Sequence, residues 1–168
     1  DEGALELGLA FHDHRYAYTG HAIRRTMVRF TLPEVALAEA RDLNRHRTGS
    51  KYSPAVPTGF YGALDQADAS IAATIQNLIE EVGERSARQA ALWLKEENPE
   101  YPYWLTLGCT VPFEHTTTGD KFLYEAELRT GTGAHYRYAK HFRDLLALWY
   151  EKFPSTKGLI HEGEAEPE

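Results

Sequence analysis

Residues 22–47, AIRRTMVRFTLPEVALAEARDLNRHR, carry the signals that decide the fold class. From Val28 onward, apolar and polar side chains alternate, which predicts a half-buried strand over residues 22–32. Pro33 suits the first position of a helix, and we expect that helix over residues 34–47. A strand that leads directly into a helix indicates a fold that mixes the two.

Helical periodicity returns after a loop rich in proline and glycine. The further elements that we expect are a one-sided helix over residues 64–82, a helix over 84–96, a strand or buried extended chain over 104–113, a helix over 118–129 and a final helix over 138–153. Gly83 is expected to separate the first two helices, because glycine weakens a helix interior. Pro154 is expected to end the last one.

Composition is that of a globular domain. The chain has 168 residues, of which 42% are hydrophobic and 26% are charged. We expect an α+β fold, with one helix-rich domain over residues 1–154, a small sheet flanked by helices, and an acidic, mobile tail over residues 155–168. No apolar run approaches membrane-spanning length, and a single cysteine, Cys109, fits a reducing, cytoplasmic compartment.

The net charge of −7 argues against a nucleic-acid polymer as partner, because neutralised phosphates supply most of such binding. An acidic chain binds an anionic ligand where cations gather locally. Three segments offer arginines that suit phosphate, at residues 45–47, at Arg88 and at Arg129. Each also has an ordinary surface role, since cations complement helix ends and Arg88 can pair with Glu84 four residues earlier.

Three other patterns suggest chemistry that we do not expect. His12 and His14 lack further ligands at metal-binding spacing, so no metal site is predicted. The Gly-Thr-Gly at residues 131–133 has no strand before it and no acidic residue after it, so it is not a dinucleotide-binding motif. Nothing near Cys109 in the sequence would activate its thiol, and a buried small hydrophobe is the better interpretation.

Taken in order, the arginine segments resemble the flavin-dependent thymidylate synthases. Arg45-His46-Arg47-Thr48-Gly49-Ser50 matches the start of the family signature, which is Arg-His-Arg, two residues and Ser. Glu84-x-x-Ala87-Arg88 is similar to the helix that supplies a phosphate-binding arginine. Leu128-Arg129, with Ala134 five residues on, matches the C-terminal segment. The resemblance covers most of residues 22–153.

The resemblance implies a one-carbon transfer from methylenetetrahydrofolate to C5 of the uracil of UMP or dUMP. Reduced FAD would supply the hydride, and NADPH would reduce the flavin. It also implies a homotetramer whose sites are shared between subunits, and an α/β core flanked by helices without a Rossmann motif. It leaves open which residues stack on the folate, for which the candidates are Tyr16, Tyr18, Tyr52 and Tyr136.

The resemblance also implies roles for individual residues. Arg129 is the expected catalytic residue, since a fixed cation at the uracil carbonyl stabilises negative charge on the ring. The residues expected at the nucleotide are Asp42, Arg45, Lys51, Tyr52, Ser53, Arg88 and Arg129. The residues expected at the flavin are His21, Arg45, His46, Arg47, Ser50, Thr118, Asp120, Tyr124 and His135.

The chain departs from the family pattern around the nucleotide and the flavin. The stretch that usually follows Ser50 is missing, so Lys51-Tyr52-Ser53 stands for the family's Arg-Tyr-Ser. Further replacements are Asp42 for a glutamine, Gly133 for a histidine with His135 nearby, and Thr118-Gly119-Asp120 for Asn-x-Arg. These changes predict an altered nucleotide range. The alternatives are 5-hydroxymethylation of the same nucleotide, a non-catalytic flavin- or nucleotide-binding relative, and an α+β domain with incidental arginines.

Overall fold

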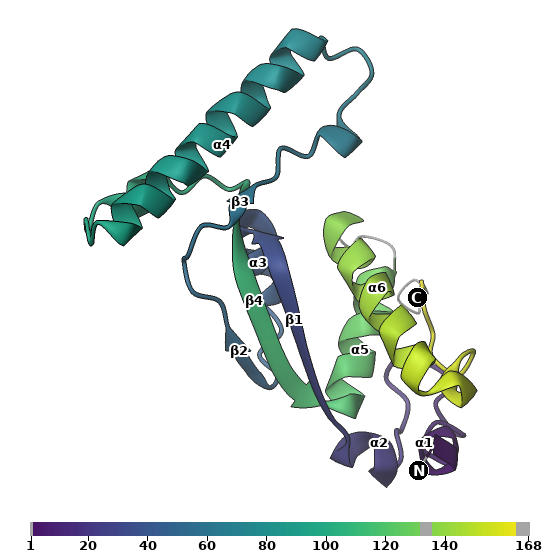
Figure 1. Cartoon of the computed structure of the whole chain (residues 1–168). Coiled ribbons are helices and arrows are strands. Elements are labelled where there is room, and N and C mark those ends of the chain that lie inside the picture. The colour runs from purple at the N-terminus through teal and green to yellow at the C-terminus, as the bar shows by residue number, and fades with distance from the viewer. Residues whose placement is uncertain (1, 132–135, 164–168) are drawn as a thin grey trace. The chain divides into compact units, whose positions relative to one another are not determined.

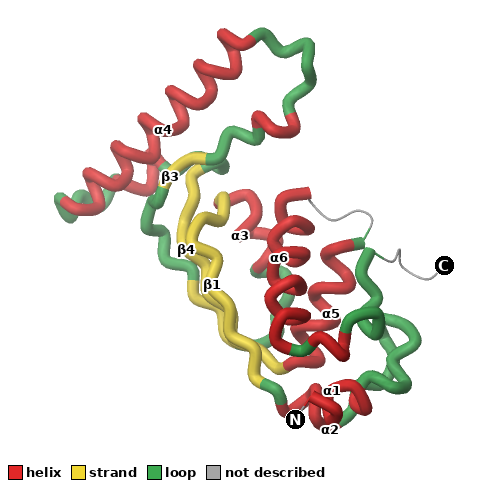
Figure 2. The backbone as a smooth tube through the Cα atoms, turned by 45° about the vertical axis from the view of Figure 1, so that its right-hand side comes forward, coloured by secondary structure: helices red, strands yellow, loops and turns green. Residues whose placement is uncertain are grey.

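The computed structural model describes residues 2–131 and 136–163 and has an α+β fold with a small antiparallel sheet (Figures 1 and 2). The helices are α1 (Glu2–Gly8), α2 (His21–Arg25), α3 (Leu37–Leu43), α4 (Ala73–Lys95), α5 (Gly119–Thr130) and α6 (Tyr136–Lys152). Short 3-10 helices are η1 (Leu64–Gln66), η2 (Tyr101–Trp104) and η3 (Pro154–Thr156). The strands are β1 (Met27–Ala36), β2 (Ser50–Tyr52), β3 (Gly59–Phe60) and β4 (Cys109–Thr118). The expected α+β class is confirmed.

β4 is the strand to which the others pair. The order in the sheet is β1-β4-β2, and β3 also pairs antiparallel with β4, with Gly59 opposite Thr110 and Phe60 opposite Cys109. Burial alternates along β4, so that every second residue from Cys109 to Thr117 is buried. His115 is one of these buried positions, which is unusual for an ionisable side chain.

The predicted boundary between strand and helix at Pro33 is wrong. Pro33 lies inside β1, and α3 begins at Leu37 and ends at Leu43, before Arg45. β1 is an edge strand of the described sheet, and an edge tolerates proline because one side of the strand donates no ladder hydrogen bond. The start of the predicted strand is also different, because residues 21–25 form α2.

Gly83 does not separate two helices, because α4 runs through it from Ala73 to Lys95. The glycine is buried, and a Cβ at this position would overlap the ring of Phe60 in β3. Its small size therefore permits the close approach of α4 to β3. The predicted helix over residues 64–82 begins only at Ala73 and exposes much of its apolar face, for example at Ile75 and Leu78.

The two C-terminal helices agree with prediction. α5 covers the segment expected over residues 118–129, and α6 covers most of that expected over 138–153. The apolar face expected on α6 is buried at Tyr138, Phe142 and Trp149. β4 begins at Cys109, later than the extended segment that was expected over 104–113.

By its contacts the chain divides into two compact units, which we describe separately. Unit 1 contains Asp1–Phe30, His46–Ser50 and His115–Glu168, and unit 2 contains Thr31–Arg45 and Lys51–Glu114. The core of unit 1 is aromatic, with Phe30, Phe122, Tyr138, Phe142 and Trp149 in ring contact between α5, α6 and the start of β1. The core of unit 2 includes Val35, Leu43, Ala87, Ala90, Val111 and Phe113.

Residues 155–163 pack within unit 1, although a separate tail was expected from residue 155. Thr156 and Ile160 are buried, and the Trp149 indole donates a hydrogen bond to Thr156 Oγ1 at 2.9 Å. Residues 164–168 lie outside the described part of the chain. Within residues 2–131 and 136–163, every helix is too short or too polar to cross a lipid bilayer.

Candidate functional site

Arg129, in the last turn of α5, contacts the Arg-His-Arg segment in unit 1. Its Nε donates a hydrogen bond to His46 Nε2 at 2.7 Å, across 83 residues of sequence. The accepting nitrogen of His46 carries no proton in this arrangement. The guanidinium also lies over the Tyr138 ring, 4.9 Å from its centroid, which is a favourable cation–π geometry. The fold therefore joins two of the three segments on which the sequence resemblance rests.

Aromatic rings extend this cluster. Tyr124 lies near the middle of α5, with its ring centroid 6.4 Å from that of His46 and 5.9 Å from that of Tyr16. Tyr16 is exposed, while Arg129 and Tyr124 are half-buried. The cluster thus presents a cation and several π faces at a partly open surface, which suits a planar anionic ligand.

The His46–Ser50 loop is attached to β4 and α5 by further contacts. Thr48 Oγ1 donates to Glu125 Oε1, and His115 Nε2 donates to the Thr48 carbonyl oxygen at 2.8 Å. Gly49 has a φ of +66°, and a Cβ at this position would overlap the carbonyl oxygen of Thr116. Glycine is suited to this turn because it adopts positive φ without strain.

The sequence reasoning missed Glu125 and His115. A signal for each was present, because each is an ionisable residue at a position that the periodicity of its element assigns to the core. What each contacts could not be predicted, because Thr48 is 77 and 67 residues away from them.

The other described residues predicted at the flavin have structural partners or are exposed. Thr118 is the N-cap residue of α5, and its hydroxyl donates to Asp120 Oδ1 at 2.5 Å. Asp120 lies in the first turn, where a carboxylate complements the helix dipole. His21 is exposed at the start of α2, Arg47 is exposed in the loop, and Ser50 is exposed at the start of β2. His135 and Gly133 lie outside the described residues.

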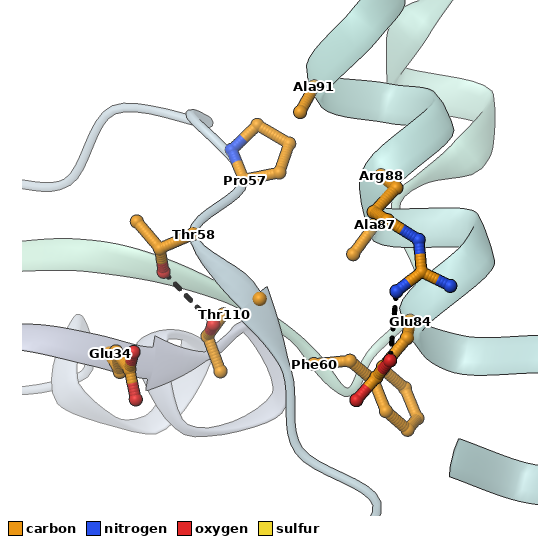
Figure 3. A pocket seen from close by; sticks show the side chains of 10 residues that line it. Glu34, Pro57, Thr58, Phe60, Glu84, Ala87, Arg88, Ala91 and Thr110 are labelled. Carbon is orange, nitrogen blue, oxygen red and sulfur yellow. Dashed lines mark hydrogen bonds and ion pairs between the residues drawn. The ribbon is translucent and has the colours of Figure 1, made fainter. Parts of the chain in front are cut away.

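Arg88 lines a cavity of about 410 Å³ in unit 2 (Figure 3). The cavity lies between α4 and the segment around β3, with Thr58 and Thr110 hydroxyls 2.9 Å apart on its wall. Arg88 Nη1 pairs with Glu84 Oε2 at 2.9 Å, and 68% of the arginine side chain is exposed. Glu34 is a second carboxylate in the lining.

The remaining residues predicted at the nucleotide also belong to unit 2. Asp42 Oδ1 is 3.5 Å from Arg45 Nε and 3.9 Å from Arg41 Nε, so its charge is balanced by two cations. Ser53 Oγ donates to the Pro112 carbonyl at 3.1 Å. Lys51 is half-buried and Tyr52 is exposed on β2. Arg45 and Arg88 therefore belong to one unit and Arg129 to the other.

Cys109 and His12 have structural surroundings. Cys109 is fully buried in β4, and burial raises the pKa of its thiol, which disfavours the reactive thiolate. His12 is buried and its Nε2 donates to Glu127 Oε1 at 2.7 Å. Among the described residues, no group of three or more His, Cys, Asp or Glu side chains is arranged to hold a metal ion.

Comparison of the chain with models of known protein families, and with curated proteins, yields no match.

Proposed function

We propose that the protein is a flavin-dependent enzyme that methylates C5 of a uridine monophosphate, UMP or dUMP, with methylenetetrahydrofolate as the one-carbon donor. The observation that carries the proposal is the hydrogen bond between Arg129 and His46. It connects the Leu-Arg and Arg-His-Arg segments, which are two of the three segments on which the resemblance to flavin-dependent thymidylate synthases rests. Both segments would have to meet if they served one flavin.

The residues of unit 1 fit a flavin chemically. Tyr16, Tyr124 and His46 offer π faces for a planar ring system, and Arg47 offers an exposed cation for the phosphates. Bound FAD, reduced by NADPH, would supply the hydride that completes the methyl group. No nucleophilic side chain is required, which agrees with the burial of Cys109.

Arg129 is assigned the activation of the uracil ring. Its Nε is committed to His46, which orients the guanidinium and leaves its two Nη groups as the donors assigned to the carbonyl of the nucleotide. Because Arg129 is half-buried, its charge acts through a medium less polarisable than bulk water. A donor of this kind, aimed at a developing oxyanion, typically lowers a barrier by about 3–4 kcal/mol.

Arg88 is assigned to the nucleotide phosphate. Glu84 competes for the guanidinium, but an exposed ion pair contributes only about 0–1 kcal/mol, and a bidentate phosphate contact is stronger. Asp42 is assigned as the acceptor for a ribose hydroxyl, which would extend the range to UMP. We propose specifically that the protein is a shortened member of this family, of the kind that methylates UMP and dUMP in polyoxin biosynthesis.

A homotetramer with shared sites is part of the proposal. The first half of α4 exposes large apolar residues at helical spacing, namely Ile75, Leu78, Ile79 and Val82. Such a stripe suits packing against a helix of another copy, because it removes apolar surface from water on both partners. Light scattering coupled to size-exclusion chromatography measures the oligomeric state, and a monomer at micromolar concentration would contradict this part.

The decisive experiment measures flavin uptake and turnover in the same preparation. Purified protein is incubated with FAD and its visible spectrum recorded after removal of free flavin. NADPH, methylenetetrahydrofolate and either UMP or dUMP are then added, and the nucleotide product is identified by mass. We expect flavin binding and a methylated product. Protein that neither retains FAD nor converts either nucleotide refutes the proposal.

Two other outcomes of this assay identify the alternatives. A 5-hydroxymethyl product indicates that water traps the one-carbon intermediate. Flavin retention without release of the C5 hydrogen indicates a non-catalytic relative, which the missing stretch after Ser50 and the pairing of Arg88 with Glu84 favour.

A further inference from the structure

A buried carboxylate and a buried imidazole meet at one loop residue, Thr48. The side chains of Glu125 and His115 are only 2% and 1% exposed, and His115 Nδ1 lies 3.5 Å from Glu125 Oε2. Removing two such groups from water is costly, and apolar residues of similar size often stabilise a core as well or better. Core stability alone therefore gives no reason for an ionisable pair at these two positions.

The pair of Glu125 and His115 holds the loop through both the side chain and the backbone of Thr48. Glu125 accepts a hydrogen bond from the Thr48 hydroxyl, while His115 donates one to the Thr48 carbonyl at 2.8 Å. Two residues earlier, His46 is held by Arg129 at 2.7 Å. One residue later, Gly49 lies so close to β4 that no side chain fits. Residues on both sides of Arg47 are thus anchored, whereas Arg47 itself is exposed.

We propose that Glu125 and His115 are positioning residues that preorganise the His46–Ser50 loop for an anionic ligand. This inference rests on the proposed function, in which the loop binds the phosphates of FAD. A loop that is already ordered loses less conformational entropy on binding, so the affinity of Arg47 and its neighbours for phosphate rises without any contact between the pair and the ligand.

Matched substitutions test the positioning role. Thr48→Val removes the hydroxyl that Glu125 accepts and keeps the side-chain shape, whereas Thr48→Ser keeps the hydroxyl. Glu125→Gln weakens the pair, and Glu127→Gln is its control. Glu127 is an equally buried carboxylate on the same helix, but it binds His12 and the His161 amide rather than the loop.

Two measurements are made on the full chain, namely the FAD dissociation constant and amide hydrogen exchange of a peptide covering residues 46–50. We expect Thr48→Val and Glu125→Gln to weaken FAD binding by roughly tenfold or more, since a buried hydrogen bond that holds the loop is lost or weakened. Exchange in the loop should be faster in the same two variants. Thr48→Ser and Glu127→Gln should resemble the wild type in both measurements, even where Glu127→Gln lowers the melting temperature.

The outcomes separate this inference from the proposed function. A wild type that binds no FAD refutes the proposed function. In that case, amide hydrogen exchange of residues 46–50, measured without FAD, still tests the positioning role. Equal loop exchange in Thr48→Val and wild type overturns the positioning role. Equal FAD affinity in Thr48→Val and wild type also overturns the positioning role. The same holds if Glu127→Gln loses as much FAD affinity as Glu125→Gln.

Discussion

Replacement of Arg129 by glutamine tests the proposed chemistry most directly. The structure gives this side chain a hydrogen bond to His46 and a cation–π contact with Tyr138. A hydrogen bond contributes about 0.5–1.5 kcal/mol and a partly exposed cation–π contact about 0.5–1 kcal/mol. The free energy of unfolding should therefore fall by about 1–2.5 kcal/mol. A chain of this size should tolerate such a loss and remain folded.

The effect on catalysis should be much larger than the effect on stability. Loss of a charge aimed at a developing oxyanion should reduce kcat by roughly 100- to 1,000-fold. The assay is nucleotide turnover at saturating FAD, folate and NADPH, with the melting temperature and FAD affinity measured on the same samples. Arg143→Gln is the control, because Arg143 is an exposed arginine on α6 of the same unit, and its Nη2 donates to the Thr130 carbonyl at 3.4 Å. A folded, FAD-loaded Arg129→Gln enzyme with near-wild-type kcat would refute the assignment.

Three further predictions concern unit 2. Arg88→Gln should raise the KM for the nucleotide by roughly tenfold with a small change in kcat. Glu84→Gln should lower that KM, because it frees the Arg88 guanidinium. If steady-state kinetics show that both variants change the KM in the same direction, the phosphate role of Arg88 is contradicted. Gly83→Ala should lower the melting temperature despite the better helix propensity of alanine, because overpacking against Phe60 should reduce the free energy of unfolding by about 1–3 kcal/mol. Phe60→Leu should relieve part of this loss in a double-mutant cycle. Cys109 should react with a thiol reagent at pH 8 far more slowly in folded than in denaturant-unfolded protein, because burial raises the pKa of its thiol and blocks access of the reagent. Equal reaction rates in the two states would show that β4 opens readily.

Local sequence patterns predicted the C-terminal half of unit 1 well. The apolar positions of α6 recur at helical spacing and fall on one face, and this face is buried against α5. The pattern suffices because nearly every side chain on that face packs in the same direction.

Two residues with strong local preferences misled the prediction elsewhere. Pro33 is typical of a helix start, yet it lies in a strand, where its position at a sheet edge removes the cost of the missing donor. Gly83 is typical of a helix end, yet it lies mid-helix because the Phe60 ring occupies the space of a Cβ. In both cases the deciding feature depends on segments remote in sequence, namely the strand order for Pro33 and the Phe60 ring for Gly83.

By itself, the sequence determined the α+β class, the two C-terminal helices and the arginine segments from which a function can be proposed, because all three depend on residue types at short spacing. The tertiary structure alone decided which of these groups meet. It joined His46 to Arg129, placed Arg88 beside a cavity together with Glu34 and Thr110, and brought Glu125 and His115 to Thr48. Contacts across tens of residues depend on how strands and helices pack, and no local pattern encodes that packing.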